Sequence, residues 1–306
     1  VEKDNIMPIP DFQTFMSPWL DSISDGKEYS VKEVKEKFAV FFKAPEEERR
    51  QKIPSQRAFL FDNRMGWANT YLKKAGLVFS KKRGMLGITE SGKDFLSAHV
   101  GQIKLSDLKR LDAFSISTGE KSTIADDETE VEEGNRTPEE IIDREYEAIK
   151  AALVSELIAL VKSCSPLFFE NMVVDLLITM GYGGSRKEAG KAIGRSGDGG
   201  IDGIINEDKL GLDSIYVQAK RWENTVPVKE IRDFAGSLLG KKARKGVFIT
   251  TSDFPKSAYE FASSIEPKMV LIDGRKLAEL MIQNNVGVTT KISYEIKDID
   301  HDYFEE

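Results

Sequence analysis

The stretch that decides the fold, residues 197–222, reads GDGGIDGIINEDKLGLDSIYVQAKRW. Its apolar runs predict two β-strands, over residues 201–205 and 215–221, joined by a polar loop. The second strand carries enough β-branched residues to lie inside a sheet rather than at its edge. We therefore expect the two strands to lie side by side, with the rest of the domain built around them.

The second strand combines an apolar face with a polar one. Because successive side chains of a strand point to opposite faces, Tyr216, Gln218 and Lys220 share one face, and the apolar face can enter a core. An unpaired lysine inside a sheet is costly. Asp202, on the neighbouring strand and beside Gly203, which permits close approach, is the expected partner of Lys220.

An aspartate facing a glutamine and a lysine two residues apart is typical of metal-dependent phosphodiester hydrolysis. Asp202 supplies the hard oxygen that Mg²⁺ (or Mn²⁺) prefers, and such a metal activates water and stabilises charge on the phosphate. Lys220 would orient or deprotonate the attacking water and balance negative charge. The alternative is a glycine-rich turn followed by a solvent-facing lysine on an edge strand. The joint spacing favours the hydrolytic interpretation.

The pattern GDGGIDG followed by QAKRW resembles the catalytic domain of Mrr-type restriction endonucleases, in the PD-(D/E)xK nuclease superfamily. The resemblance extends to PLFFENMVVDLLITMGYGG (166–184), KGVFITTS (245–252) and LIDGRKLAELMIQNNVGV (271–288). It reaches more weakly into the N-terminal part, in NRMGWANTYLKKAGL (63–77) and GITESG (87–92). It therefore covers most of the chain.

The resemblance implies roles for particular residues. Asp202, Gln218, Lys220 and Glu170 would be catalytic, and the metal would be held by Asp202, Glu170, Gln218 and the carbonyl of Ala219. Gln218 stands where most of the superfamily has an acid, so the site loses one negative charge and the number of metal ions stays open. The neighbouring Asp198 would support the metal ligands through hydrogen bonds. The implied substrate is methylated foreign DNA.

The composition excludes several classes of protein. The chain has 306 residues, 40% of them hydrophobic, which is enough for two domains with cores. One cysteine, Cys164, and two histidines, His99 and His301, exclude a Cys/His zinc site, and no Walker A sequence is present. No secretory signal and no membrane-spanning apolar run is present, so we expect a cytoplasmic protein without a membrane partner.

The net charge of −7 conflicts at first sight with DNA binding. The acidic residues gather over residues 126–147, whereas residues 1–125 carry more basic than acidic side chains. The overall charge therefore says little about the binding face of either domain.

The chain divides by composition into five parts. We expect residues 1–7 to be disordered or an added end, because Met7 resembles a natural start. Residues 8–97 form a first domain, and residues 98–137 a polar, acidic linker. The catalytic domain follows over residues 138–296, and residues 297–306 form an acidic tail.

The first domain reads as a winged helix. Helices over residues 11–23, from Ser30, and over 62–75 precede a hairpin with a basic tip, and a short helix follows from Thr89 or Ser91. Such a domain usually places its third helix in the major groove and its wing on the DNA backbone. The alternatives are a solvated basic face or a winged helix used for dimerisation. The candidate DNA-binding residues, together with Arg221 after the catalytic strand, are Arg57, Arg64, Asn69, Lys73, Lys74, Lys81, Lys82 and Arg83.

The second domain alternates strands and helices. Thr137–Pro138 and Ser165–Pro166 are strong starts for two helices, and strand, strand, helix, strand, helix, strand, helix follow. The expected fold class is therefore α+β with two domains. An N-terminal winged helix precedes a PD-(D/E)xK-type α/β nuclease fold, whose mixed central sheet is flanked by helices.

We predict a Mg²⁺-dependent endonuclease of a restriction system that cuts methylated double-stranded DNA. Because cutting both strands takes two sites, a homodimer or higher homo-oligomer is expected. Two alternatives remain at this point. One is a DNA-binding or regulatory protein that retains a nuclease fold without activity, which Gln218 favours, and the other is a structure-specific repair nuclease.

Overall fold

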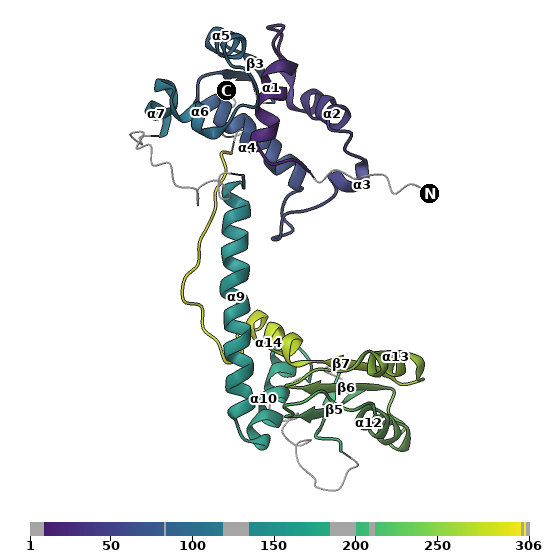
Figure 1. The fold of residues 1–306 in the computed structure, drawn as a ribbon. Helices are drawn as coiled ribbons and strands as arrows, with labels where there is room; N and C mark the ends of the chain where they lie inside the picture. The colour runs from purple at the N-terminus through teal and green to yellow at the C-terminus, as the bar shows by residue number, and fades with distance from the viewer. Residues whose placement is uncertain are drawn as a thin grey trace. The chain divides into compact units, whose positions relative to one another are not determined.

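The computed structural model describes residues 9–82, 84–118, 135–183, 200–207, 212–300 and 303. The side chains of residues 81, 82, 115, 117 and 118 are not described. Asp198, Arg83 and the expected N-terminal end, residues 1–7, lie outside the described residues. The chain forms two compact units, residues 1–148 with 298–306, and residues 149–297 (Figure 1).

The first unit is mainly helical, with one small antiparallel sheet in the order β1-β3-β2. Ser30 caps α2 and Thr89 caps α5, as their sequence positions predict. Its helices are η1 (Gln13–Phe15), α1 (Met16–Ser22), α2 (Val31–Phe41), α3 (Glu46–Arg49), α4 (Leu60–Lys74), α5 (Glu90–Ala98), α6 (Leu105–Lys109) and α7 (Asp112–Thr118). Its strands are β1 (Tyr29–Ser30), β2 (Val78–Lys82) and β3 (Met85–Ile88).

Aromatic side chains fill the core of the first unit. Phe15, Trp19 and Phe61 are fully buried, and the ring of Phe15 meets that of Phe61 edge-on at 5.1 Å. Trp67 and Tyr71 of α4 pack against this core, which confirms that they serve packing.

The segment expected as a linker, residues 98–137, contains folded structure. Helices α6 and α7 lie within it, and Ile103, Leu108 and Phe114 are buried in the core of the first unit. These helices are too short to show a clear helical repeat of apolar residues in the sequence. The polar composition of the segment therefore predicted a linker. The expected boundary at residue 138 also shifts, because residues 138–148 belong to the first unit.

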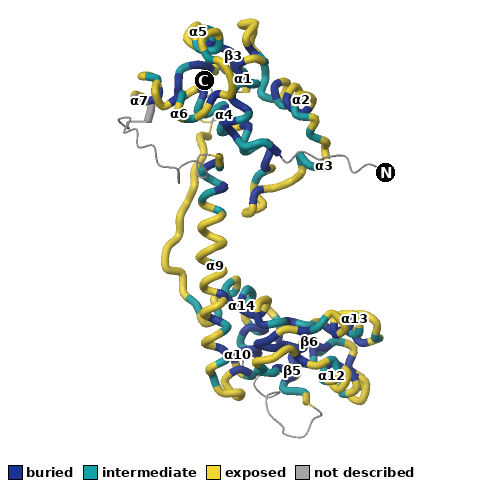
Figure 2. The backbone as a smooth tube through the Cα atoms, viewed as in Figure 1, coloured by how far each residue is buried: buried dark blue, intermediate teal, exposed yellow. Residues whose placement is uncertain are grey.

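The second unit is built on a mixed sheet in the order β4-β5-β6-β7. Its strands are β4 (Gly203–Asn206), β5 (Ser214–Lys220), β6 (Lys245–Thr250) and β7 (Lys268–Ile272). β4 and β5 are antiparallel, whereas β5, β6 and β7 are parallel. Figure 2 shows buried residues along the central strands and on the helices that cover them.

Helices cover both faces of this sheet. The later part of α9 (Pro138–Ser163), α10 (Pro166–Thr179) and α14 (Gly274–Gln283) bury one face. α12 (Val228–Gly240) and α13 (Lys256–Ser264) bury the other. The expected α+β class with a mixed sheet flanked by helices is confirmed.

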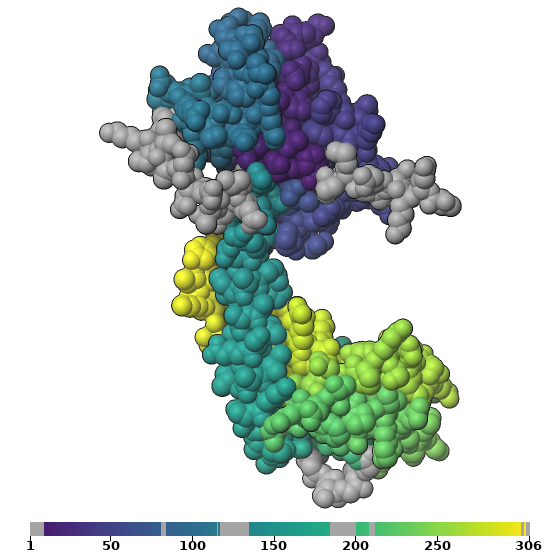
Figure 3. All heavy atoms as spheres, in the orientation of Figure 1, coloured from purple at the N-terminus to yellow at the C-terminus, as the bar shows by residue number. Residues whose placement is uncertain are grey.

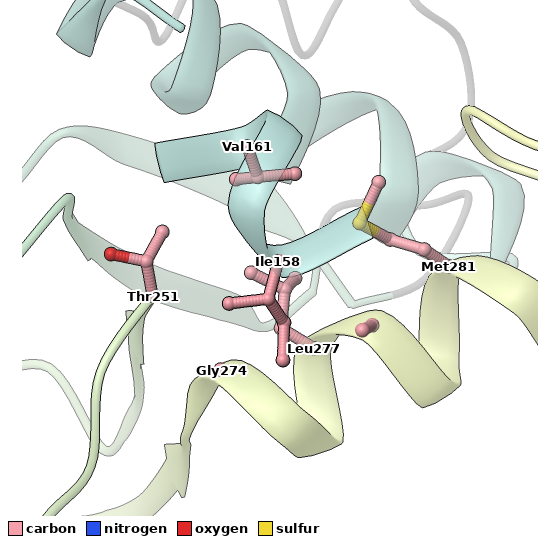
Figure 4. A pocket seen from close by; sticks show the side chains of 7 residues that line it. Ile158, Val161, Thr251, Gly274, Leu277 and Met281 are labelled. Carbon is pink, nitrogen blue, oxygen red and sulfur yellow. The ribbon is translucent and has the colours of Figure 1, made fainter. Parts of the chain in front are cut away.

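A narrow crevice between α9 and α14 is lined by Ile158, Val161, Leu277 and Met281, with Thr251 at its end (Figure 4). Its walls are aliphatic, and the Thr251 hydroxyl is already bonded to the carbonyl of Trp222 at 2.7 Å. The crevice is therefore a packing seam rather than a ligand site. In the described part of the chain, no helix combines the length and apolar character that crossing a membrane requires.

Candidate active site

Asp202 lies immediately before β4 and is tied to β5 by two hydrogen bonds. Its backbone N–H donates to the carbonyl of Val217 at 2.9 Å, and its Oδ2 accepts from the backbone N–H of Ala219 at 2.8 Å. The carboxylate therefore takes the place of the strand carbonyl that β4 no longer supplies. This arrangement fixes one carboxylate oxygen on β5.

Two carboxylates share a desolvated environment. Burial raises the pKa of Asp202, although the Ala219 N–H and the charge of Lys220 act in the opposite direction. Burial also raises the pKa of Glu170, on α10, and the charge of Asp202 raises it further. Keeping both groups ionised without a cation is unfavourable, so the pair favours binding of a positive ion.

Gln218 adds an uncharged oxygen to the site. Its side chain is 4% exposed and shares a strand face with Lys220. Among the described residues, no donor bonds to its Oε1. A buried acceptor without a donor is costly, and a metal ion satisfies it as a donor would.

These groups fit a divalent cation with oxygen ligands. Asp202, Glu170, Gln218 and the carbonyl of Ala219 would supply the hard oxygens that Mg²⁺ prefers. The described residues contain no cluster of three or more acidic, His or Cys side chains of metal-binding geometry. The proposed site has only two carboxylates, and its other oxygens come from an amide and a backbone carbonyl.

Lys220 is paired differently from our expectation. Its Nζ lies 3.1 Å from Oε2 of Glu230, in the first turn of α12, and no ion pair with Asp202 is present among the described residues. The expected Asp202–Lys220 ion pair is therefore wrong. The expectation took the partner of Lys220 from the neighbouring strand. The actual partner, Glu230, belongs to α12, which covers the polar face of β5.

Two buried threonines, Thr250 and Thr251, hold the end of β5. The hydroxyl of Thr250 donates to the carbonyl of Lys220 at 2.9 Å, and Thr251 accepts from the N–H of Trp222 at 3.0 Å. Both threonines are at most 2% exposed. In the sequence, these threonines stand out by their position at the end of the apolar strand in KGVFITTS, residues 245–252.

Arg221 also has a structural partner. Its Nη1 donates to the carbonyl of Lys162, near the end of α9, at 2.5 Å. A cation at this end of a helix interacts favourably with the helix dipole. The expectation that Arg221 contacts DNA is therefore not supported by its position, because the guanidinium is engaged with α9.

Gly200 forms a close wall of the site, with φ +84° and a virtual Cβ 2.6 Å from Nε2 of Gln218. We expect Gly200→Ala to displace Gln218 and to slow DNA cleavage by up to about 100-fold, since small misplacements carry such costs. Gly181 is the matched control, with φ +101° but no atom within 4 Å of its virtual Cβ. Single-turnover cleavage rates check this, and equal rates for Gly200→Ala and Gly181→Ala would contradict it.

Arg64 is engaged inside the first unit rather than free for DNA. Its Nη2 lies 2.7 Å from Oε1 of Glu140, and its Nη1 donates to the carbonyls of Ile9 and Pro10 at 2.6 and 3.0 Å. These contacts give Arg64 a structural role, so its position does not support the expectation that it binds DNA. Its partner lies 76 residues further along the chain, beyond any local signal.

The start of α9 docks on α4 through further polar contacts. Thr137, which is fully buried, donates to Oδ1 of Asn63 at 2.6 Å, and Trp67 Nε1 donates to Glu139. Thr137 and Glu140 also form the reciprocal bonds of a capping box. The helix start predicted at Thr137–Pro138 is confirmed, and these contacts place residues 137–140 against α4.

We expect Arg64→Met to destabilise the first unit by about 3 kcal/mol, because it leaves the carboxylate of Glu140 buried and unpaired. The Glu140 side chain is 10% exposed. The control is Lys35→Met, since the Lys35–Asp62 pair is about one-third exposed and should contribute less than about 1 kcal/mol. Urea unfolding checks this, and equal losses for the two variants would count against it.

The other candidate DNA-binding residues have mixed environments. Arg57 and Lys73 are exposed, and Lys74 Nζ lies 5.7 Å from the ring centroid of Tyr71. The Oδ1 of Asn69 is buried and meets no donor among the described residues. For Lys81 and Lys82 the structure describes only the backbone, in β2.

Comparisons with known proteins show which family the chain belongs to. Residues 161–281 match a family model described as a restriction endonuclease (Mrr_cat), and residues 12–98 match the Mrr N-terminal domain. Over 98% of its length, the chain is 36% identical to the type IV methyl-directed restriction enzyme EcoKMrr of Escherichia coli (strain K12), all of which is covered.

Two solved structures show a lower similarity to the chain. MspJI restriction endonuclease in complex with a 27-mer oligonucleotide aligns over 66% of this chain and 49% of its own, at 18% identity and a TM-score of 0.33. The DNA modification-dependent restriction endonuclease AspBHI aligns over 69% and 57%, at 17% identity and a TM-score of 0.36. At these TM-scores the likeness carries no argument about fold.

The match of residues 161–281 defines the second unit as the catalytic part of a restriction endonuclease. The full-length identity then narrows the class, and the chain belongs to the Mrr family.

Proposed function

We propose that this protein is a Mg²⁺-dependent endonuclease that hydrolyses phosphodiester bonds of modified DNA within a restriction system. The observation that carries the proposal is the carboxylate of Asp202, whose Oδ2 accepts from the N–H of Ala219, together with the buried, donorless oxygen of Gln218, the residue before Ala219 on β5. The preference for methylated DNA rests on family membership and on the methyl-directed E. coli relative. The PD-(D/E)xK assignment rests on Asp202, directly before β4, followed by Gln218 and Lys220 on β5.

The side chains have separate tasks in this proposal. Asp202, Glu170, Gln218 and the Ala219 carbonyl would hold the metal, which activates water and stabilises negative charge on the scissile phosphate. Lys220 orients the attacking water and balances the charge that develops on the phosphate. Thr250, which bonds the carbonyl of Lys220, keeps the end of β5 from moving during the reaction.

We infer that the first unit is a winged helix that binds DNA. The order of α1, β1, α2, α4, β2 and β3, with β1, β2 and β3 in one sheet, supports this. α4 would face the major groove with Lys73 and Asn69, while the hairpin with Lys81, Lys82 and Arg83 would contact phosphates. Lys73→Ala should then weaken DNA binding and reduce its salt dependence. A variant that binds DNA with the wild-type affinity at every salt concentration would contradict the assignment.

A homo-oligomer follows from double-strand cleavage, which takes two sites. Large apolar side chains on α9 are available to a second copy, with Ile142, Tyr146 and Ile149 each more than half exposed. The space-filling view shows α9 at the molecular surface (Figure 3). Light scattering checks this, and a monomer that makes double-strand breaks at the same concentration would contradict it.

The function is tested with methylated and unmethylated plasmid, incubated with Mg²⁺ or with EDTA. We expect cleavage that needs Mg²⁺, prefers methylated plasmid and is lost in Asp202→Ala and Lys220→Ala. A branched DNA substrate is added to the comparison, and preferential cleavage of branched DNA, whatever its methylation, would instead indicate a structure-specific repair nuclease. If the wild type, Asp202→Ala and Lys220→Ala all bind DNA and none of them cleaves it, a non-catalytic DNA-binding protein is favoured. The neutral Gln218 makes such a protein the second candidate.

A further inference from the structure

We propose that Glu230 is the positioning residue for Lys220, and that it keeps Lys220 from pairing with Asp202 and thereby closing the metal position. The inference rests on the proposed function of Asp202 and Lys220. Glu230 belongs to α12 and lies outside the two strands that carry the site. It acts through Lys220 and does not itself contact the reacting atoms.

Local geometry sets Glu230 free for this task. It is the third residue of α12, a position from which a glutamate usually bonds back to the N–H of the capping residue. The capping residue here is Pro227, which has no N–H to donate. The carboxylate therefore reaches Lys220, and the helix dipole favours its negative charge at this end.

The contact is specific and partly shielded. Nζ of Lys220 lies 3.1 Å from Oε2 of Glu230, and the two side chains are 31% and 24% exposed. Both ends are anchored, since α12 packs on the sheet through the fully buried Ile231, and Thr250 holds the backbone of Lys220. The ammonium group therefore has a defined position before substrate arrives.

The charges at the site explain why such a residue is needed. Oδ2 of Asp202 accepts from the backbone N–H of Ala219, the residue directly before Lys220, so this carboxylate is the alternative partner for a lysine that has lost Glu230. Gln218 contributes no negative charge to compete for the ammonium. Glu230 supplies that charge from the helix side, which leaves the free oxygen of Asp202 open to a cation.

The test compares Glu230→Gln with the wild type in two measurements, single-turnover cleavage and the rise in Tm on adding Mg²⁺. We expect cleavage to fall on the order of 10- to 100-fold, as for a small misplacement of a reacting group. The Mg²⁺-induced rise in Tm should shrink, because Lys220 turns to Asp202. Glu230→Asp keeps the charge and should lie closer to the wild type in both measurements.

Two further variants separate positioning from a merely structural role. In Lys220→Gln/Glu230→Gln, the rise in Tm with Mg²⁺ should return, because no lysine remains to occupy Asp202. Asp233→Asn, which breaks the exposed Lys229–Asp233 pair on the same helix, should behave as the wild type.

The inference would be overturned if Glu230→Gln cleaved DNA and responded to Mg²⁺ as the wild type does. It would also be overturned if Asp233→Asn lost as much cleavage and Mg²⁺ response as Glu230→Gln. Failure of the double variant to recover the Mg²⁺ response would also overturn it. If the wild-type protein itself cleaves no DNA, the proposed function fails instead. The Mg²⁺ response of the four variants still tests Glu230 in that case.

Discussion

Lys220→Gln should slow DNA cleavage by about a thousandfold at saturating enzyme, since removing one preorganised donor to a developing anion costs up to that much. The lysine is placed for this by β5, whose end is held by Thr250, and by Glu230 at 3.1 Å. The rise in Tm with Mg²⁺ should persist, because every proposed metal ligand remains. Single-turnover rates on methylated plasmid, with parallel binding assays, check the prediction.

Lys245→Gln is the matched control for this variant. Lys245 is also a strand lysine, on β6, with 32% exposure against 31% for Lys220, and it pairs with Asp213 and Glu207. Its loss should leave cleavage near the wild-type rate. A Lys220→Gln enzyme within about threefold of that rate would refute the role of Lys220 in transition-state stabilisation.

The second large effect is expected for Asp202→Asn, which should abolish Mg²⁺-dependent cleavage without destabilising the metal-free protein. The loss of several kcal/mol of charge stabilisation corresponds to a thousandfold or more in rate, on the order of the metal's whole contribution. The asparagine oxygen can still accept from the N–H of Ala219. The rise in Tm on adding Mg²⁺, worth about 2.7 kcal/mol at a hundredfold excess over Kd, should disappear.

The sign of the metal-free effect follows from the pKa. Burial raises the pKa of Asp202, so the folded protein holds its proton more tightly than the unfolded chain does. The ionised carboxylate therefore lowers stability at pH values above its folded-state pKa. Asp202→Asn should raise the metal-free Tm there, and the gain should vanish as pH falls to the ordinary range of aspartate.

Asp213→Asn should show the opposite sign. The hydrogen bond from Lys245 holds the pKa of Asp213 below its ordinary value, so its ionised form stabilises the fold above the ordinary pKa of aspartate. Differential scanning fluorimetry over a pH series compares the two variants. A metal-free Tm for Asp202→Asn clearly below the wild type at neutral pH would contradict the pKa argument.

Local sequence patterns predicted many of the helices and strands correctly. Alternation along residues 215–221 identified β5 and the face shared by Gln218 and Lys220, because side-chain direction in a strand depends only on position. Ser30, Thr137 and Ser165 marked helix starts correctly, because a cap bonds backbone groups within its own turn.

Local patterns did not predict contacts between residues that are distant in the sequence. The polar composition of residues 98–137 concealed α6 and α7, whose few apolar residues become informative only when they meet a core formed elsewhere. Arg64 resembled a DNA-binding residue on its own helix, yet Glu140 lies against it in the folded unit. Basic side chains have the same local signature in both situations.

The sequence by itself determined the strand pair, the candidate oxygen donors and the family, since these depend on residue type and short spacing. Only the tertiary structure decided that Lys220 pairs with Glu230, that Asp202 caps the N–H of Ala219, and that Arg221 and Arg64 are engaged within their units. The physical reason is that an ion pair or hydrogen bond depends on which backbone the fold brings within about 3 Å, and no local pattern encodes that meeting.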